Sequence, residues 1–93
     1  MDSEGKRIYE QVIFRKGPEH QIWVAVEECS ELIDSLAKLH RGRCSKGDVI
    51  TEIADVSVMI DQLSIIFGEE KVEKEKTRKI SRLSERLSTN DNL

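Results

Sequence analysis

Glycine and proline divide this chain into four segments, and the apolar residues within each segment recur at helical spacing. The breaks are Gly17 with Pro18, the polar stretch 42–47, and Gly68. Apolar residues three and four positions apart share one face of a helix, whereas the residues of a strand alternate between two faces. The single proline and the scarcity of aromatic residues also favour helices over strands. The sequence therefore predicts an all-α protein.

The expected helices follow from these breaks, and they cover residues 3–15, 18–41, 48–67 and 70–87. Pro18 suits the first position of a helix, where its missing N–H costs nothing, and Asp48 can cap the third helix. Short connections place neighbouring helices antiparallel. We therefore expect one four-helix bundle-like domain over residues 1–93, with its core at 3–88 and a disordered tail at 89–93.

The small size of this domain predicts self-association. A chain of 93 residues buries a limited fraction of its surface, so four helices make a thin core. The last helix has few apolar positions and is mostly charged, which is typical of a helix that stays solvated or packs along a partner subunit. A homo-oligomer is the expected result.

Charge and cysteine usage narrow the class of function. Acidic residues outnumber basic ones by 18 to 15, whereas nucleic-acid-binding proteins usually show a basic face, so no nucleic-acid partner is expected. Cys29 and Cys44 lack CxxC spacing and a Cys/His cluster, which predicts two free thiols in a reducing compartment. The chain shows no secretory segment and no apolar run of bilayer length. We expect a soluble cytoplasmic protein with no membrane partner.

Two pairs of carboxylates carry the candidate chemistry. Glu28 and Glu31 lie three residues apart in the second expected helix, so they share a helix face. Glu52 and Asp55 form the same spacing in the third, on a sector whose other residues are apolar and should be buried. Buried carboxylates without partners are costly, and Mg²⁺ prefers carboxylate oxygens as ligands. Two such pairs on facing helices predict a Mg²⁺ site, because carboxylate-bound metals inside bundles are built in this way.

An ordinary solvated charged face is the alternative interpretation of these acids. It accounts well for Glu27 and leaves Glu31, which lies toward the polar face, open to either interpretation, whereas Glu28 flanks the apolar stripe of its helix. It accounts less well for Glu52 and Asp55, because those two residues share a face with apolar side chains.

The same residues resemble the motif of the MazG-like, all-α nucleoside triphosphate pyrophosphohydrolases, which is EExxE followed after a gap by ExxD. The motif stands here as Glu27-Glu28-Cys29-Ser30-Glu31 and Glu52-Ile53-Ala54-Asp55. The likeness to small, phage-type members extends over residues 17–87. The resemblance implies Mg²⁺-dependent hydrolysis of (d)NTPs to (d)NMPs and pyrophosphate, with Mn²⁺ as a substitute ion. It also implies a homo-oligomer, a dimer or a tetramer with the tetramer preferred.

The resemblance further implies four metal ligands, which are Glu28, Glu31, Glu52 and Asp55. Glu27 would then support the site or position the attacking water. Many relatives carry another Glu where this chain has Thr51, so this chain lacks a peripheral acid of the family pattern. Metal ions neutralise the charge of phosphate oxygens and lower the pKa of a bound water, which makes attack on phosphorus feasible.

Four further side chains are candidates for substrate contact, namely Gln21, Lys38, Lys79 and Arg82. Basic groups stabilise transferred phosphates and a leaving pyrophosphate. Each of these four residues also has a structural interpretation. Gln21 fits a polar residue at the boundary of the core, Lys38 fits an i, i+4 pair with Asp34, and the other two fit surface charges.

Two other functions stay open at the level of the sequence. Phosphoribosyl-ATP pyrophosphohydrolase has a related bundle and acidic motif, although the segment after Asp55 is more similar to the phage-type group. A non-catalytic helical interaction module, docking through its last helix, would leave the position of Glu52 and Asp55 unexplained. The base and the sugar of the substrate are not indicated by these residues.

Overall fold

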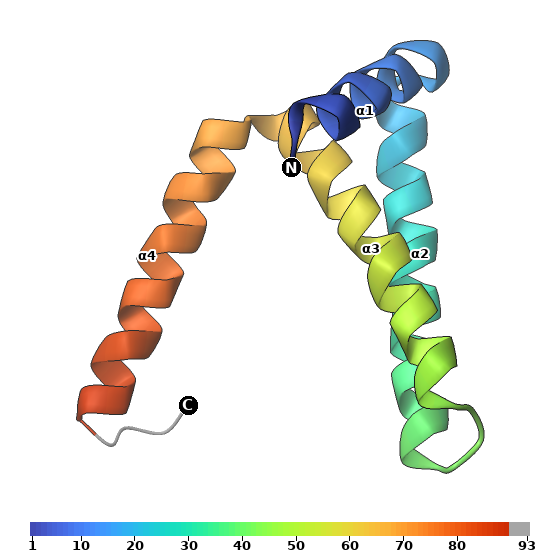
Figure 1. The fold of residues 1–93 in the computed structure, drawn as a ribbon, viewed down its shortest axis with the longest axis vertical. Helices are drawn as coiled ribbons and strands as arrows, with labels where there is room; N and C mark the ends of the chain where they lie inside the picture. Colours follow the sequence, from blue (N-terminus) through green and yellow to red (C-terminus); the bar gives the residue numbers. More distant parts are fainter. Residues whose placement is uncertain (90–93) are drawn as a thin grey trace.

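The computed structural model describes residues 1–89, which form four α-helices (Figure 1). Their bounds are α1 Ser3–Lys16, α2 Pro18–His40, α3 Lys46–Phe67 and α4 Glu69–Ser88. No strand occurs within this range, so the all-α prediction is confirmed. None of the four helices contains an apolar stretch of the length and purity needed to cross a bilayer. The expected tail lies, from residue 90 onward, outside the described residues.

Side-chain caps set the starts of α1 and α3. A carboxylate oxygen of Asp2 accepts the backbone N–H of Gly5 at 2.7 Å, which satisfies one of the free donors of the first turn. At α3, the Ser45 hydroxyl accepts the N–H of Asp48 at 3.2 Å, and the Asp48 carboxylate accepts the N–H of Ser45 at 2.9 Å. The prediction that Asp48 itself caps α3 was wrong, because Ser45 is the N-cap of this reciprocal capping box and the helix begins at Lys46, two residues before the expected start.

The antiparallel pair α2 and α3 forms the centre of the molecule, and α1 crosses one end of it (Figure 1). The core between them is thin, as expected. Its buried apolar side chains, among the described residues, are Ala25, Val49 and Met59, and no large side chain is completely buried. We call this pair of helices the α2–α3 hairpin.

A pair of buried amides fixes the start of α2 against the end of α3. Gln21 Nε2 donates a hydrogen bond of 2.8 Å to Gln62 Oε1, and both side chains are about 95% buried. His20 Nδ1 lies 2.8 Å from Gln21 Oε1. Buried polar groups are tolerated when they are hydrogen-bonded, and an inter-helix pair of this kind specifies the alignment of the two helices.

Helix α4 leaves the end of α3 through Gly68 alone and runs apart from the α2–α3 hairpin (Figure 1). Gly68 adopts φ of 117°, a region that favours glycine. An ion pair of 2.8 Å between Lys6 and Glu69 ties the start of α4 to α1. The radius of gyration of 16.1 Å exceeds the value of about 12 Å expected for a compact chain of this length. One copy of the chain therefore does not close a four-helix bundle.

Candidate functional site

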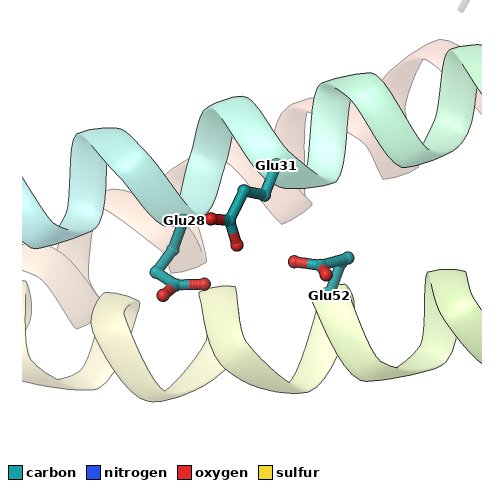
Figure 2. A group of neighbouring side chains, drawn as sticks. All are labelled: Glu28, Glu31 and Glu52. Atoms are coloured by element: carbon teal, nitrogen blue, oxygen red, sulfur yellow. The ribbon is translucent and has the colours of Figure 1, made fainter.

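Three glutamates converge between α2 and α3. Glu28 and Glu31 come from α2, Glu52 comes from α3, and the three side chains point toward one another (Figure 2). One carboxylate oxygen from each residue lies within 4.8 Å of those of the other two. The short loop after α2 brings the second half of that helix beside the first half of α3, which places the two motif segments face to face. We call these three residues the acidic cluster.

The acidic cluster is partly shielded from solvent and its charges are not balanced. Glu28 and Glu52 are half-buried, whereas Glu31 is exposed. The Oε2 atoms of Glu28 and Glu52 are buried and have no hydrogen-bond partner. Burial of a carboxylate oxygen without a partner costs free energy, because the lost hydration is not replaced.

The pKa values of two of these groups reflect this environment. Burial raises the pKa of Glu28 above its ordinary value of 4.5, and the nearby charges of Glu31, Asp55 and Glu52 raise it further. Burial also raises the pKa of Glu52, followed by the charges of Glu31 and Asp55. The folded chain therefore holds protons on this site more tightly than the unfolded chain does.

We expect the metal-free protein to lose stability as the pH rises from about 4.5 toward neutrality, in part because of these two groups. The folded state binds more protons than the unfolded state in this window, so the free energy of unfolding falls as protons leave. Thermal melts in EDTA at pH 4.5 and 7.5 measure the effect. The double variant Glu28→Gln/Glu52→Gln should lose less stability across the window than the parent does, and Glu73→Gln should behave as the parent. Equal losses in all three proteins would contradict the assignment.

No basic side chain within the described residues forms an ion pair with the acidic cluster. Lys38, the nearest basic candidate on α2, instead pairs with Asp34 at 2.8 Å. Hard divalent cations are held by carboxylate oxygens, and Mg²⁺ sits about 2.0–2.1 Å from each ligand, so two opposite ligands are about 4.2 Å apart. Adjacent ligands of an octahedral ion are about 3 Å apart, so the three oxygens, which lie within 4.8 Å of one another, would have to draw closer by up to about 2 Å. The three side chains offer carboxylate oxygens, two of them buried and unpartnered, which is the donor type that Mg²⁺ prefers.

Two of the predicted acids lie outside this convergence. Asp55 is exposed, so the prediction that it shares a buried face with Glu52 was wrong. The hairpin is only two helices thick, and α1 crosses only the end where α2 begins and α3 ends (Figure 1), so the edge of the contact between α2 and α3 stays open to solvent. Asp55 still acts on the cluster through its charge. Glu27 is exposed, and its carbonyl accepts the hydroxyl of Ser30 at 2.9 Å.

A pocket of about 290 Å³ opens beside the acidic cluster. Its lining combines acidic and basic side chains from α2, α3 and the loop between them: Glu31, Asp34, Ser35, Lys38, Arg43, Cys44, Asp48 and Glu52. Lys38 lines this pocket and also forms the i, i+4 pair with Asp34 that its structural interpretation predicted. Arg43 was not among the predicted contact residues. Its place in the loop that joins the two motif helices could have indicated that it lies close to the acids. The pocket therefore places two basic side chains, Lys38 and Arg43, beside the acidic cluster.

The remaining predicted contact residues lie elsewhere. Gln21 is buried and bonded to Gln62, so its amide serves the packing of α2 on α3. Lys79 and Arg82 belong to α4, which runs apart from the hairpin (Figure 1). Cys29 and Cys44 are free, as predicted, and the Cys44 thiol donates to the carbonyl of Ser35 at 3.3 Å.

Comparison with known proteins identifies no relative of this chain. No protein-family model matches the chain, and searches of curated proteins and of solved structures find no similar protein or fold. A function can therefore be inferred only from the residues and the geometry described above.

Proposed function

We propose that this chain is a Mg²⁺-dependent nucleotide pyrophosphohydrolase, which cleaves (d)NTPs to (d)NMPs and pyrophosphate. The observation that carries the proposal is the convergence of Glu28, Glu31 and Glu52 between two helices, with two carboxylate oxygens buried and unpartnered. A solvated charged face would not place carboxylate oxygens in that position, because each could find water at no cost. The resemblance of the EExxE and ExxD segments to the MazG-like motif supports the same function.

Within this proposal, Glu28, Glu31 and Glu52 hold the ion, and the exposed Asp55 lies near enough to join them from the rim. When bound, Mg²⁺ neutralises charge on the phosphate oxygens and makes a water molecule more acidic. With the ion bound, the carboxylates would no longer destabilise the fold, since the cation would offset the burial and the like charges that raise the pKa of Glu28 and Glu52. Binding of the ion and stability of the fold are thereby coupled.

The pocket beside the acidic cluster gives the substrate its expected orientation. Lys38 and Arg43 line that pocket together with two of the cluster acids. A triphosphate placed there has its negative charge next to both basic groups and to the ion. Lys38 would exchange its contact with Asp34 for a phosphate oxygen, which needs only a side-chain rotation because that ion pair is exposed to solvent. The pocket and the cluster together therefore suit a polyphosphate ester.

Product analysis tests this reaction directly. The purified protein is incubated with MgCl₂ and a panel of NTPs and dNTPs, and the products are resolved by ion-exchange chromatography. We expect nucleoside monophosphate and pyrophosphate in equal amounts. Phosphoribosyl-ATP joins the panel, because preferential cleavage of that compound would identify the related enzyme instead. Diphosphate and orthophosphate as products would contradict cleavage between the α and β phosphates.

A folded protein that binds Mg²⁺ and cleaves none of these compounds would refute the nucleotide specificity. A folded protein that neither binds Mg²⁺ nor turns over any compound would refute the enzyme and favour a helical interaction module. Calorimetric titration with MgCl₂, run on the same sample, separates these two outcomes.

A further inference from the structure

Helix α4 has an apolar stripe that the rest of the described chain leaves exposed. The stripe consists of Val72, Ile80, Leu83 and Leu87, which lie on one side of the helix with exposed fractions of 38%, 56%, 46% and 65%. Gly68 is the only residue between α3 and α4, whereas helices packed side by side as antiparallel neighbours are usually joined by two to eight residues. In keeping with this limit, α4 diverges from the α2–α3 hairpin along its length (Figure 1).

The second half of α4 is strongly basic. Residues 76–88 contain one acid, Glu85, and five basic side chains, which are Lys76, Arg78, Lys79, Arg82 and Arg86. At about 100° of rotation per residue, Lys79 and Arg86 border the apolar stripe, and Arg78 and Arg82 lie on the polar side. Lys76 lies within the stripe, where its four-carbon stem is itself apolar.

The charge of the α2–α3 hairpin has the opposite sign. Helices α2 and α3 together carry nine carboxylates and two lysines. A negatively charged surface would therefore attract the second half of α4 and repel the hairpin, so the charges alone would orient the molecule on such a surface. The divergence of α4 from the hairpin lets the two parts respond separately (Figure 1).

The composition of α4 also differs from that of the helices that pack on protein. Of the four helices, α4 has the most one-sided arrangement of apolar residues and is the least hydrophobic on average. Helices α2 and α3, which pack on each other, are much more hydrophobic on average. A one-sided helix of low overall hydrophobicity, with Lys and Arg on its polar side, is typical of helices that lie in the surface of an anionic membrane.

The start of α4 repeats this combination of apolar and basic groups. A hollow of about 510 Å³ is lined there by Phe67, Lys71, Val72, Glu75, Lys76 and Lys79. Phe67 and Val72 are exposed, and three of the other four lining residues are lysines. A lysine stem can lie along apolar surface while its ammonium stays among polar groups. The apolar stripe thus begins at the end of α3 and has basic groups beside it from there onward.

We propose that α4 is an anchor that lies in the surface of a lipid bilayer containing anionic lipids. Ile80, Leu83 and Leu87 enter the boundary between headgroups and acyl chains, and the basic side chains of residues 76–88 contact lipid phosphates. The expectation of no membrane partner depended on the lack of a spanning segment, which a helix lying in the surface does not need. The proposal is independent of the proposed reaction, because it involves no residue of the acidic cluster.

Sedimentation with lipid vesicles tests the anchor. The protein is kept in EDTA, so that Mg²⁺ cannot bridge carboxylates and lipid phosphates, and is mixed with phosphatidylcholine vesicles containing about 30% phosphatidylglycerol. We expect binding whose partition coefficient falls at least about tenfold on vesicles of phosphatidylcholine alone, because each Lys or Arg near an anionic surface favours binding. A similar fall is expected in about 0.5 M NaCl, which screens this attraction. No binding to the anionic vesicles, or equal binding to both kinds, would overturn the proposal.

Two double variants of α4 locate the contact. Ile80→Ser/Leu83→Ser removes two apolar side chains from the stripe, and Arg78→Gln/Arg82→Gln removes two charges from the polar side. Each should lower the partition coefficient on anionic vesicles at least about tenfold. Circular dichroism in the absence of lipid should show the helical content of the parent, which separates a lost contact from a lost fold.

Matched double variants outside α4 are the controls. Ile33→Ser/Ile50→Ser removes two exposed apolar side chains from the hairpin, and Arg7→Gln/Arg15→Gln removes two exposed charges from α1. Both should keep the parental partition coefficient within about twofold, because neither changes α4. Equal losses in these controls and in the α4 variants would overturn the proposal.

Tryptophan fluorescence identifies what covers the stripe. In a Trp23→Phe chain, Leu83→Trp places the only tryptophan on the stripe, and Glu85→Trp places it on the opposite side of α4. Vesicles that contain brominated phosphatidylcholine should quench the emission of Leu83→Trp strongly and that of Glu85→Trp several-fold less. Blue-shifted emission from Leu83→Trp before lipid is added, with no quenching by brominated lipid, would show that protein covers the stripe, as in a self-associated form, and would overturn the proposal.

Discussion

Glu52→Gln should lower the rate of (d)NTP hydrolysis by about 10²–10³-fold, the range typical for removal of one electrostatic contact at a reacting centre. The substitution keeps the shape of the side chain and removes one charge from the acidic cluster. The lost charge weakens the hold on Mg²⁺, and it leaves the fold intact, because the buried Oε2 atom of Glu52 has no hydrogen-bond partner and no ion pair of the described residues involves Glu52. Initial rates at saturating MgCl₂, with each nucleotide that the parent cleaves, measure the effect.

The matched control is Glu73→Gln, which removes one charge from an exposed position on α4. It should retain the parental rate within about twofold. A thermal melt of Glu52→Gln in EDTA should lie at or above that of the parent, since burial and like charge raise the pKa of this group. Full activity in Glu52→Gln would show that the acidic cluster takes no part in the reaction.

Addition of Mg²⁺ to the metal-free protein should raise its melting temperature at pH 7.5 by about 10–20 °C. A ligand that binds only the folded state at one hundred times its Kd adds about 2.7 kcal/mol of stability. For a domain of this size, each kcal/mol corresponds to a shift of about 4–8 °C. The gain is large here because the ion would compensate the two buried oxygens of Glu28 and Glu52. Melts in EDTA, and again after titration with MgCl₂, measure it.

The double variant Glu28→Gln/Glu52→Gln should show little or no shift under the same conditions, while Glu73→Gln should shift as the parent does. Sodium sulfate at matched ionic strength is the control for charge screening. Screening weakens the repulsion between the carboxylates without any specific binding site. A shift of the same size with sodium sulfate, or in the double variant, would show that Mg²⁺ acts only as a general electrolyte.

The sequence pointed to all three residues of the acidic cluster but not to the surroundings of that cluster. Spacing alone placed Glu28 and Glu31 on one face of α2, because residues three apart share a helix face whatever the tertiary structure. Asp55 was expected to be buried beside Glu52, but it lies exposed. A helical wheel gives the direction of a side chain and not the thickness of the layer above it, so it could not separate these two residues. Arg43 was missed for a related reason, since periodicity carries no information about a loop.

The sequence by itself determined the four helices, since helical spacing, glycine breaks and capping groups act over a few residues and operate within each segment. It also determined which acids could meet, because a short loop forces α2 and α3 to run antiparallel. Only the tertiary structure decided that Gln21 belongs to the packing of the hairpin and that α4 stands apart from it. These outcomes depend on contacts between residues far apart in the chain and on the reach of a single-residue linker at Gly68. No local pattern encodes them.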